Sequence, residues 1–403
     1  MAQNLTNFDE ALKTDYLPVV RGQLNNATPL YSKIKRNSRD VSGKEWKGTV
    51  HHQRNSGVGA GAETDLPTAG QQEYKNPYGT VKFNRGRIQL SGPVMKASRN
   101  DKGAIVRALN SEMKGVTEDM KQEISYQIFN DGTGVRALVN GDPGTGTTLT
   151  VDAPGTLYLQ DGMLVDIVDA STGAVEDADV VISAVTSTTA ATVSAALDAG
   201  VEDNSKVVRA NSTDGAGTSY EMVGLKGIVD DGTYVTSLHN LSRTTYPWWK
   251  CSTFANDDNS GTNRDLTLDL IQEAISAVEK NGSTINMIVS SIELRDAYLS
   301  LVKADGRFVN TLTLDGGWKA LEYSSGATPI AWVADKDALP NTIFFLDTEH
   351  LEFMEMGDWD WMQEDGAVLS RVSGSDAYEA VLYWYAELTT DKPRAFSFLR
   401  DVQ

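Results

Sequence analysis

The chain has 403 residues, of which 40% are hydrophobic and 23% charged, a globular composition that excludes wholesale disorder. Its 36 Lys and Arg residues against 55 Asp and Glu give a net charge of −19, which argues against a DNA-binding surface spread over the whole protein. A single cysteine, Cys251, excludes an internal disulfide framework and a multi-cysteine zinc site. Neither a secretory signal nor a bilayer-spanning apolar run is readable, so we expect a soluble, intracellular product.

The charge is unevenly distributed along the chain. Residues 1–140 carry 20 basic and 14 acidic side chains, which gives +6, whereas residues 141–220 carry 2 and 12, which gives −10. The remaining residues carry 14 and 29, which gives −15. An excess of basic residues confined to the first third of an acidic chain requires an explanation in terms of what that third contacts.

The first 97 residues form two segments that lack the composition of a core. Residues 1–45 are polar, with one short helical pattern at Leu12, Tyr16 and Val19, and are typical of an arm. Strand-like stretches at Trp46–His52 and Val81–Leu90 then flank a glycine-containing connection with few large apolar groups. The connection between these two stretches is longer than is usual inside a compact domain. A hairpin of only two strands cannot bury a core by itself. We interpret it as an extended arm that packs on another subunit; a flexible loop is the alternative.

Asp101–Phe129 has the clearest helical pattern in the chain. One apolar stripe steps by three or four residues along it, as expected for a long helix that packs one face on a core. The stripe consists of Ile105, Leu109, Met113, Val116, Met120, Ile124 and Ile128.

Composition changes sharply in residues 141–219, which contain one aromatic residue, Tyr158, and are rich in Thr, Ala, Asp, Gly and Val. Short strands are predicted at Leu164–Val168, Val180–Val185 and Lys206–Arg209, separated by turn clusters. We expect a small, acidic, all-β insertion.

Beyond Tyr220 the pattern is mixed. Helices are predicted at Leu266–Glu279 and at Ile292–Val302, the second capped by Ser290 or Ser291. The predicted strands of this region are Ile285–Val289, Pro329–Val333, Ile343–Leu346, Leu351–Met356, Ala367–Val372, Ala380–Leu388 and Ala395–Leu399.

Several motifs resemble catalytic or ligand-binding motifs, but the sequence around each of them does not fit that function. Gly57-x-Gly59-x-Gly61 has no strand before it and no helix after it, as a nucleotide fingerprint would require. Asp230-Asp231 and Asp257-Asp258 lie among turn residues and are interpreted as solvated carboxylates, and Cys251 has no base near it in sequence. Asp358-Trp359-Asp360 with the acidic residues after it has the wrong spacing for a calcium loop. We therefore expect no catalytic residue, cofactor or metal.

The order of the elements, an arm, a long hairpin, a long helix, an α/β region and terminal antiparallel strands, resembles the major capsid proteins of tailed bacteriophages with the Hong Kong 97-type fold. Four local sequences are similar to that family: Asn130–Gly134, Leu225–Asp230, Leu241–Lys250 and Asp391–Ala395. The resemblance implies an α+β fold and covers nearly the whole chain except residues 141–219, which look like the extra β domain of some members.

The resemblance implies six parts. They are an N-terminal arm (1–45), an E-loop (46–97), a peripheral domain with its spine helix (98–140), the inserted β domain (141–219), an axial domain (220–341) and returning peripheral strands (342–403). It further implies hexamers and pentamers that form the icosahedral head shell around double-stranded DNA, bound without sequence specificity. Scaffolding protein (expected to be a separate chain), portal and possibly a decoration protein are implied partners, no membrane is involved, and the protein would be assembled in the host cytoplasm as part of the virion.

Two alternatives remain open at this point. An encapsulin-like compartment has the same fold but would carry protein cargo, and an acidic β-rich binding protein belongs to a different class. On the capsid reading, basic residues of the two arms would contact acidic surfaces of other subunits; facing DNA, or facing only solvent, are the other possibilities. The candidate inter-subunit contacts are Arg36, Arg39, Arg54, Lys75, Lys82, Arg85 and Arg87, together with Lys33 and Lys35.

Overall fold

The computed structural model describes residues 28–61, 63, 66–93, 108–256, 262–304, 311–313, 319–324, 329–363 and 368–403. Two compact units share these residues: the smaller holds those within Arg85–Lys121 and Trp359–Tyr383, and the larger holds the rest. The short helix predicted near Leu12 and the first turns of the helix predicted from Asp101 lie outside the described residues, as does Asp257-Asp258.

The smaller unit is a layer of strands with a helix packed on it. Three of its elements, β7, β25 and helix α3, continue into residues of the larger unit. Gly86 of β7 lets the helix come close, because a Cβ at that position would lie 2.7 Å from Val116 of α3. Strand β25 pairs antiparallel with two short strands and also pairs with β7. The elements are β7 (Lys82–Ser91), α3 (Ala108–Phe129), β23 (Asp360–Trp361), β24 (Ser370–Arg371) and β25 (Ala377–Thr390).

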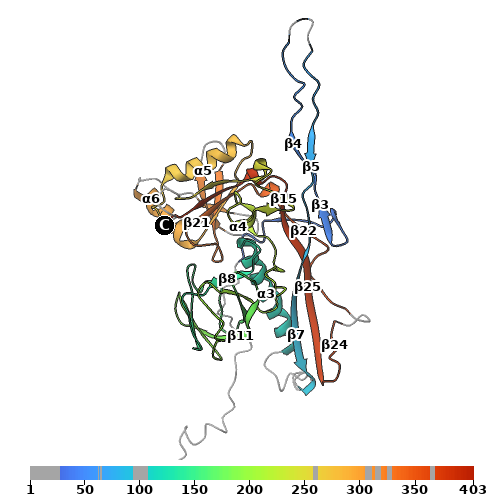
Figure 1. Cartoon of the computed structure of the whole chain (residues 1–403), viewed down its shortest axis with the longest axis vertical. Helices are drawn as coiled ribbons and strands as arrows, with labels where there is room; N and C mark the ends of the chain where they lie inside the picture. Colours follow the sequence, from blue (N-terminus) through green and yellow to red (C-terminus); the bar gives the residue numbers. More distant parts are fainter. Residues whose placement is uncertain are drawn as a thin grey trace, which may run out of the picture. The chain divides into compact units, whose positions relative to one another are not determined.

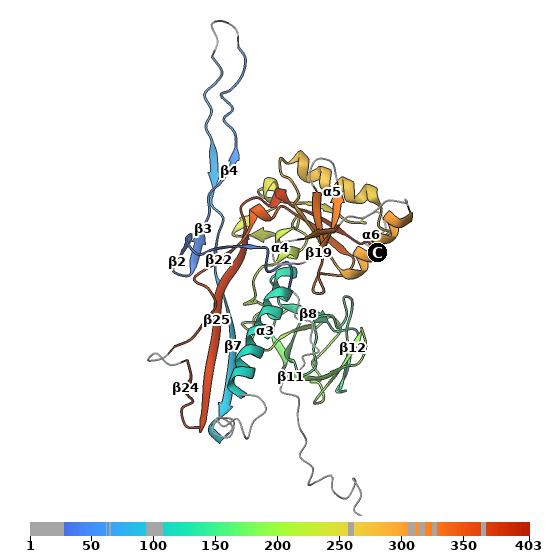
Figure 2. The same ribbon diagram turned by 180° about the vertical axis from the view of Figure 1, so that it is seen from behind.

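The first body of the larger unit is a closed, six-stranded antiparallel barrel, seen in green in Figures 1 and 2. Its strand order is β8-β13-β10-β11-β12-β9, and a bridge between Val139 and Val151 joins the first strand to the last. Aliphatic residues such as Val165, Ile167 and Val207 fill its interior. The strands are β8 (Val135–Leu138), β9 (Thr148–Thr150), β10 (Leu164–Val168), β11 (Val175–Val185), β12 (Ala190–Val193) and β13 (Lys206–Arg209).

The second body is a seven-stranded mixed sheet with α5 and α6 packed on a large core. Helix α5 begins where the Thr267 side chain accepts from Leu270 N, and it buries Ile271, Ala274 and Val278. Its elements in sheet order are β16 (Ser252–Phe254), β26 (Ser397–Arg400), β21 (Thr342–Leu346), β17 (Met287–Ser290), β20 (Pro329–Ala334), β19 (Lys319–Ser324) and β18 (Thr311–Thr313), with α5 (Leu268–Lys280) and α6 (Ile292–Ala304).

The hairpin arm, defined here as residues 45–80, is the long ribbon in Figures 1 and 2. It is paired in two places: β3 and β6 form a three-stranded sheet with β2, and β4 pairs with β5 further out. Before the arm, β1 runs parallel to β22, which pairs with the last residues of β25. These strands are β1 (Lys35–Asn37), β2 (Val41–Ser42), β3 (Glu45–Lys47), β4 (Val50–Gln53), β5 (Glu73–Lys75), β6 (Tyr78–Thr80) and β22 (Leu351–Glu355).

Short elements complete the larger unit. They are α4 (Leu225–Ile228), β14 (Ser237–Leu238), β15 (Leu241–Ser242) and the 3-10 turns η2 (Pro247–Trp249), η4 (Thr348–His350) and η5 (Pro393–Ala395).

Most predicted elements are confirmed, and four predictions are corrected. The strand predicted at Trp46–His52 is two strands, because Gly48 interrupts it and donates to Pro77 O instead. The connection after it is shorter than expected, since β5 and β6 lie inside it. The strand predicted from Ala395 begins only at Ser397, because Pro393 starts a 3-10 turn, and the strand predicted over 367–372 is found as Ser370–Arg371.

Candidate functional site

The described residues contain no group of three or more His, Cys, Asp or Glu side chains placed to hold a metal ion. Cys251 is buried, and burial raises the pKa of its thiol, so that it is not an activated nucleophile. None of the described helices is both long enough and apolar enough to cross a bilayer. The informative contacts are instead those that hold the arm and the barrel in place.

One open hollow of about 470 Å³ lies beside Ser283 and His350. His350 Nδ1 lies 2.8 Å from Asp391 Oδ1, and Lys392 Nζ donates to Ser283 Oγ across 2.6 Å. The hydrogen bond to Asp391 raises the pKa of His350.

The first paired segment of the arm is anchored on the turn between β14 and β15. His239 and Asn240 both have positive φ, 50° and 60°, which makes this a tight two-residue hairpin turn. Tyr78 N donates to His239 O across 3.1 Å, and Asn240 Nδ2 donates to Tyr78 O across 3.0 Å. The buried Trp46 ring packs edge-on against His239 at 4.8 Å between centroids. The turn thus holds β6 through its backbone and β3 through a ring.

Two ring contacts hold the second paired segment. His52 stacks on Trp248 with centroids 4.7 Å apart and an interplanar angle of 2°, and Lys75 Nζ lies 5.4 Å from the centre of the Tyr246 ring. A cation–π contact of this kind is worth ~0.5–1 kcal/mol where water has access. The four residues come from β4, β5 and the start of η2. We call the contacts of Trp46, His52, Lys75 and Tyr78 with residues 239–248 the arm anchor.

Arg243 is fully buried and links two of the segments that resemble the capsid family, Leu225–Asp230 and Leu241–Lys250. Its guanidinium donates to the carbonyls of Gly227 and Ile228 and to Asp230 Oδ2, among other acceptors. The prediction that Asp230 is a solvated turn carboxylate is wrong, because its side chain is 1% exposed. Asp231 fits the prediction better, since it is half-exposed and accepts from Thr233.

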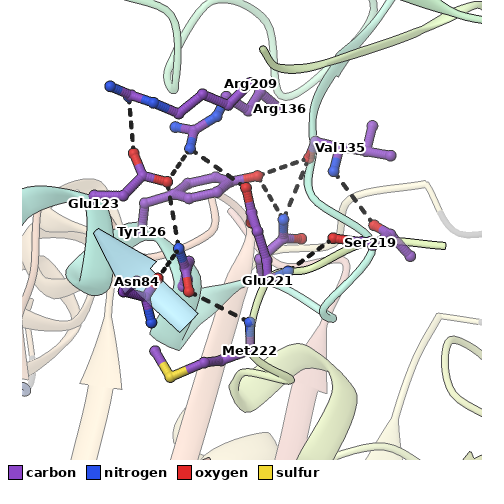
Figure 3. Close-up of polar contacts among 12 residues, drawn as sticks. Asn84, Glu123, Tyr126, Val135, Arg136, Arg209, Ser219, Glu221 and Met222 are labelled. Carbon is purple, nitrogen blue, oxygen red and sulfur yellow. Dashed lines mark hydrogen bonds and ion pairs between the residues drawn. The ribbon is translucent and has the colours of Figure 1, made fainter. Parts of the chain in front are cut away.

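The barrel is attached through a second buried cluster, which we call the root network: Glu123 and Tyr126 of α3, Arg136 of β8, Arg209 of β13, and Glu221. Figure 3 shows Glu123 between the two guanidiniums, with Arg209 Nη1 3.0 Å from Glu123 Oε2 and Arg136 Nη2 on Oε1. Burial works to raise the pKa of Glu123, but the two arginine charges outweigh it and lower that pKa. Arg136 also lies over the Tyr126 ring, 3.9 Å from its centre.

The chain that leaves the barrel is held by side chains from three elements. Gln127 of α3 accepts from Met222 N across 3.3 Å and donates to Asn84 Oδ1 across 3.0 Å. Glu387 of β25 accepts from Val223 N across 2.8 Å. Burial raises the pKa of Glu387 to about 8, although the Val223 hydrogen bond opposes the shift. The barrel is thus fastened at both its entry and its exit.

The basic residues predicted to reach other subunits are dispersed, and several have partners in their own chain. Arg36 pairs with Asp358 at 2.8 Å, Arg87 pairs with Glu379, and Lys82 Nζ donates to Ser219 O across 3.2 Å. Lys75 belongs to the arm anchor. Of the others, Lys33 is half-buried, whereas Lys35, Arg39, Arg54 and Arg85 are exposed. The described residues form no ion pair with Arg39 or Arg54.

Sequence reasoning missed the residues that make the arm anchor and the root network. Trp248 and Arg243 lay inside a sequence noted for its family likeness, but nothing in that likeness said what they contact. Arg136 and Arg209 offered one usable signal: Arg209 is one of only two basic residues in the acidic stretch from 141 to 220. An isolated basic residue in an acidic body is a reasonable candidate for a buried ion pair.

Comparison with solved structures gives matches over the whole chain. The capsid asymmetric unit of cyanophage A-1(L) has a TM-score of 0.62 and 13% identity, covering 98% of this chain and 98% of that one. The capsid of a native GTA particle gives 0.55 and 10% identity, with 98% and 96% covered. The holo-SrpI encapsulin complex from Synechococcus elongatus PCC 7942 gives 0.52 and 10% identity, with 100% and 96% covered. No family model and no curated protein matches the sequence.

These likenesses establish the class of fold: the chain has the mixed helix-and-strand fold of phage capsid proteins. The resemblance noted in the sequence is confirmed at this level. The match to the cyanophage capsid structure covers 98% of this chain.

Proposed function

We propose that this chain is the major capsid protein of a tailed bacteriophage. It assembles with itself as hexamers and pentamers into an icosahedral head shell around double-stranded DNA. The observation that carries the proposal is the end-to-end match to the cyanophage A-1(L) capsid subunit. Full coverage matters because a shared sheet alone would be compatible with many functions.

The hairpin arm supports this function from its own composition. At its far end Val58 is 83% exposed and Leu66 is 93% exposed, although both are large apolar residues. Leaving such side chains in water forgoes ~1.5–3 kcal/mol each, which burial against a second copy would recover. The anchor at Trp46 and His52 fixes the start of the arm, so its far end is presented from a constrained base.

The parts of the chain are assigned as in the related fold. Residues 1–45 are the N-terminal arm, 46–97 the E-loop, 98–140 with 342–403 the peripheral domain of a Hong Kong 97-type subunit, and 220–341 the axial domain. Residues 141–219 are an inserted β domain, an assignment supported by the closed barrel and its separate core. The barrel itself begins earlier, at Val135, so the change of composition at 141 falls after its first strand.

Partners follow from the same assignment. A scaffolding protein and a portal would join the shell, with a decoration protein as a further candidate partner, and DNA would be held without sequence readout. The net negative charge of the chain is compatible with enclosing DNA, since packaged DNA brings its own counterions. No chemical step is assigned to the chain: its place is in the virion, after assembly in the host cytoplasm.

Electron microscopy of the expressed full chain tests the proposal. Round particles of uniform size are the expected result, and a monomer at high concentration would contradict it. The contents of the particles separate the two shell functions. The encapsulin alternative, supported by the SrpI match, expects protein cargo, whereas a phage head expressed alone is expected to form shells without a bound cargo protein.

A further inference from the structure

The barrel joins the rest of the larger unit through two chain segments that lie against each other. The entry segment contains Gly134 and Arg136, and the exit segment contains Ser219 and Glu221. A Cβ on Gly134 would lie 2.9 Å from Ser219 Oγ and 3.5 Å from Glu221 Oε1, so only glycine leaves room for this approach. If the barrel moves relative to α3, the backbone of these two segments has to change conformation.

Glu221 is the one carboxylate of the root network with no hydrogen bond in the described structure. It is 5% exposed, and neither of its oxygens has a hydrogen-bonding partner. Its nearest charge is Arg136 Nη2, at 3.6 Å, and that same nitrogen is bonded to Glu123 Oε1. Two buried carboxylates therefore share one guanidinium, and Glu123 holds it, as Figure 3 shows.

The charges around Glu221 come from every element packed there. Arg136 of β8 and Arg209 of β13 are positive, whereas Glu123 of α3 and Asp131 of the following loop are negative. Tyr126 of α3 is neutral, and Asp131 is already paired with Lys226 at 2.8 Å. Burial, reinforced by Glu123, raises the pKa of Glu221 to about 7 against the opposing effect of Arg136.

We propose that Glu221 is a proton-controlled latch between the barrel and helix α3. When its carboxyl is neutral, Arg136 is paired with Glu123 alone and the root network is closed. When it is ionised, a second buried negative charge competes for Arg136, and the network opens more readily. The latch belongs to the folded chain itself and does not depend on the proposed capsid function.

The sign of the effect follows from proton linkage. In the opened root Glu221 titrates near its ordinary value of 4.5, and in the closed root near 7. Closing therefore takes up a proton: the stabilisation is complete below about pH 4.5 and is lost as pH rises through 7. Between about pH 8.5 and about pH 6, the equilibrium constant for opening should fall about tenfold.

Hydrogen exchange of the full-length protein, read by mass spectrometry at about pH 6 and about pH 8.5 and corrected for the intrinsic exchange rate, measures this opening. The reporter is the peptide that covers Gly134–Leu138. Wild type should show about tenfold greater protection there at the lower pH. E221Q, isosteric and neutral, should show the high protection at both values. E202Q, which removes an exposed carboxylate of the same barrel, should behave as wild type.

Glu387 also titrates near this site, so E387Q is a further control that should retain the response of the reporter peptide. Equal corrected protection of wild type at the two pH values, or greater protection at the higher one, would overturn the proposal even if E221Q failed to fold. A pH response that persists in folded E221Q would overturn it as well.

Discussion

Arg243 donates to Asp230 across 3.1 Å at a position where the two side chains are 0% and 1% exposed. The pair does not stand alone, since Asp230 Oδ2 also accepts from the backbone of Gly232, Tyr234 and Val235. Arg243 in turn satisfies carbonyls that α4 leaves unpaired at its C-terminal end, such as Ile228 O. One side chain thus closes a loop of the chain on which the arm anchor rests.

Replacing Arg243 should destabilise the fold strongly. R243M keeps most of the length of the side chain but leaves Asp230 as an uncompensated buried charge, which costs ~3–5 kcal/mol. Urea unfolding followed by tryptophan fluorescence measures the loss. R39M, at an exposed arginine, should stay within ~0.5 kcal/mol of wild type. A similar small effect in R243M would show that the buried pair contributes nothing net.

Glu387 should make stability fall with rising pH up to about pH 8. Its pKa is raised to about 8 by burial, so the folded state holds a proton that the unfolded state, with an ordinary value of 4.5, releases. The contribution of Glu387 to stability is then complete below pH 4.5, falls by ~1.4 kcal/mol per pH unit between about 4.5 and 8, and is lost above about pH 8. Thermal unfolding of wild type should weaken between pH 7 and 9 more than that of E387Q, and parallel curves would refute the assignment.

The elements that sequence could predict are those whose pattern has a local cause. Leu164–Val168 and Lys206–Arg209 match β10 and β13 end to end, because turn residues bound both strands. Helix α5 was predicted within two residues of each end, since its apolar stripe meets a Thr267 cap and an Asn281-Gly282 stop. The fold class came from the order of such elements.

What sequence could not predict depends on partners far along the chain. Asp230 looked like a turn carboxylate, and only the arrival of Arg243 makes it a buried one. Val135–Leu138 belongs to the barrel because it pairs with β13, about seventy residues later, and its composition gives no sign of this. Glu123 lies outside the apolar stripe that predicts the helix, yet it is a partner of two arginines.

Removing the barrel should leave a folded remainder, provided that the cut respects β8. Replacing residues 135–218 with a short Gly/Ser linker is feasible, because Gly134 already lies against Ser219. The cut removes Arg136 and Arg209 and strands Glu123, so adding E123Q to the deletion should recover ~1–3 kcal/mol in urea unfolding. A deletion of 141–219, which leaves β8 without β13, should be less stable than the 135–218 deletion, with or without E123Q. If E123Q gives no gain, the root network is not what the deletion disrupts.

The far end of the arm should be needed for assembly but not for folding. V58D/L66D places charges where exposed apolar side chains would be buried against a second copy, and buried charges without partners are strongly disfavoured. Circular dichroism should be unchanged, and electron microscopy should show no particles. T68D/Q71D adds the same charge at exposed polar positions of the same loop and should still assemble. Normal particles from V58D/L66D would show that the far end of the arm is not part of the interface between copies.

Arg39 and Arg54 are the basic residues that best test contact with acidic surfaces of neighbouring subunits, because they are exposed and form no ion pair within the described chain. Each pair formed between subunits would add only ~0–1 kcal/mol, but a shell repeats it in every copy. R39E/R54E should therefore lower the thermal stability of empty shells at low salt, whereas R39K/R54K should not. Near 1 M salt, where the screening length falls to ~3 Å, wild type and R39E/R54E should converge. Equal stability of wild-type and R39E/R54E shells at low salt would show that these arginines face solvent. A defect seen only in DNA-filled shells would show that they contact the DNA.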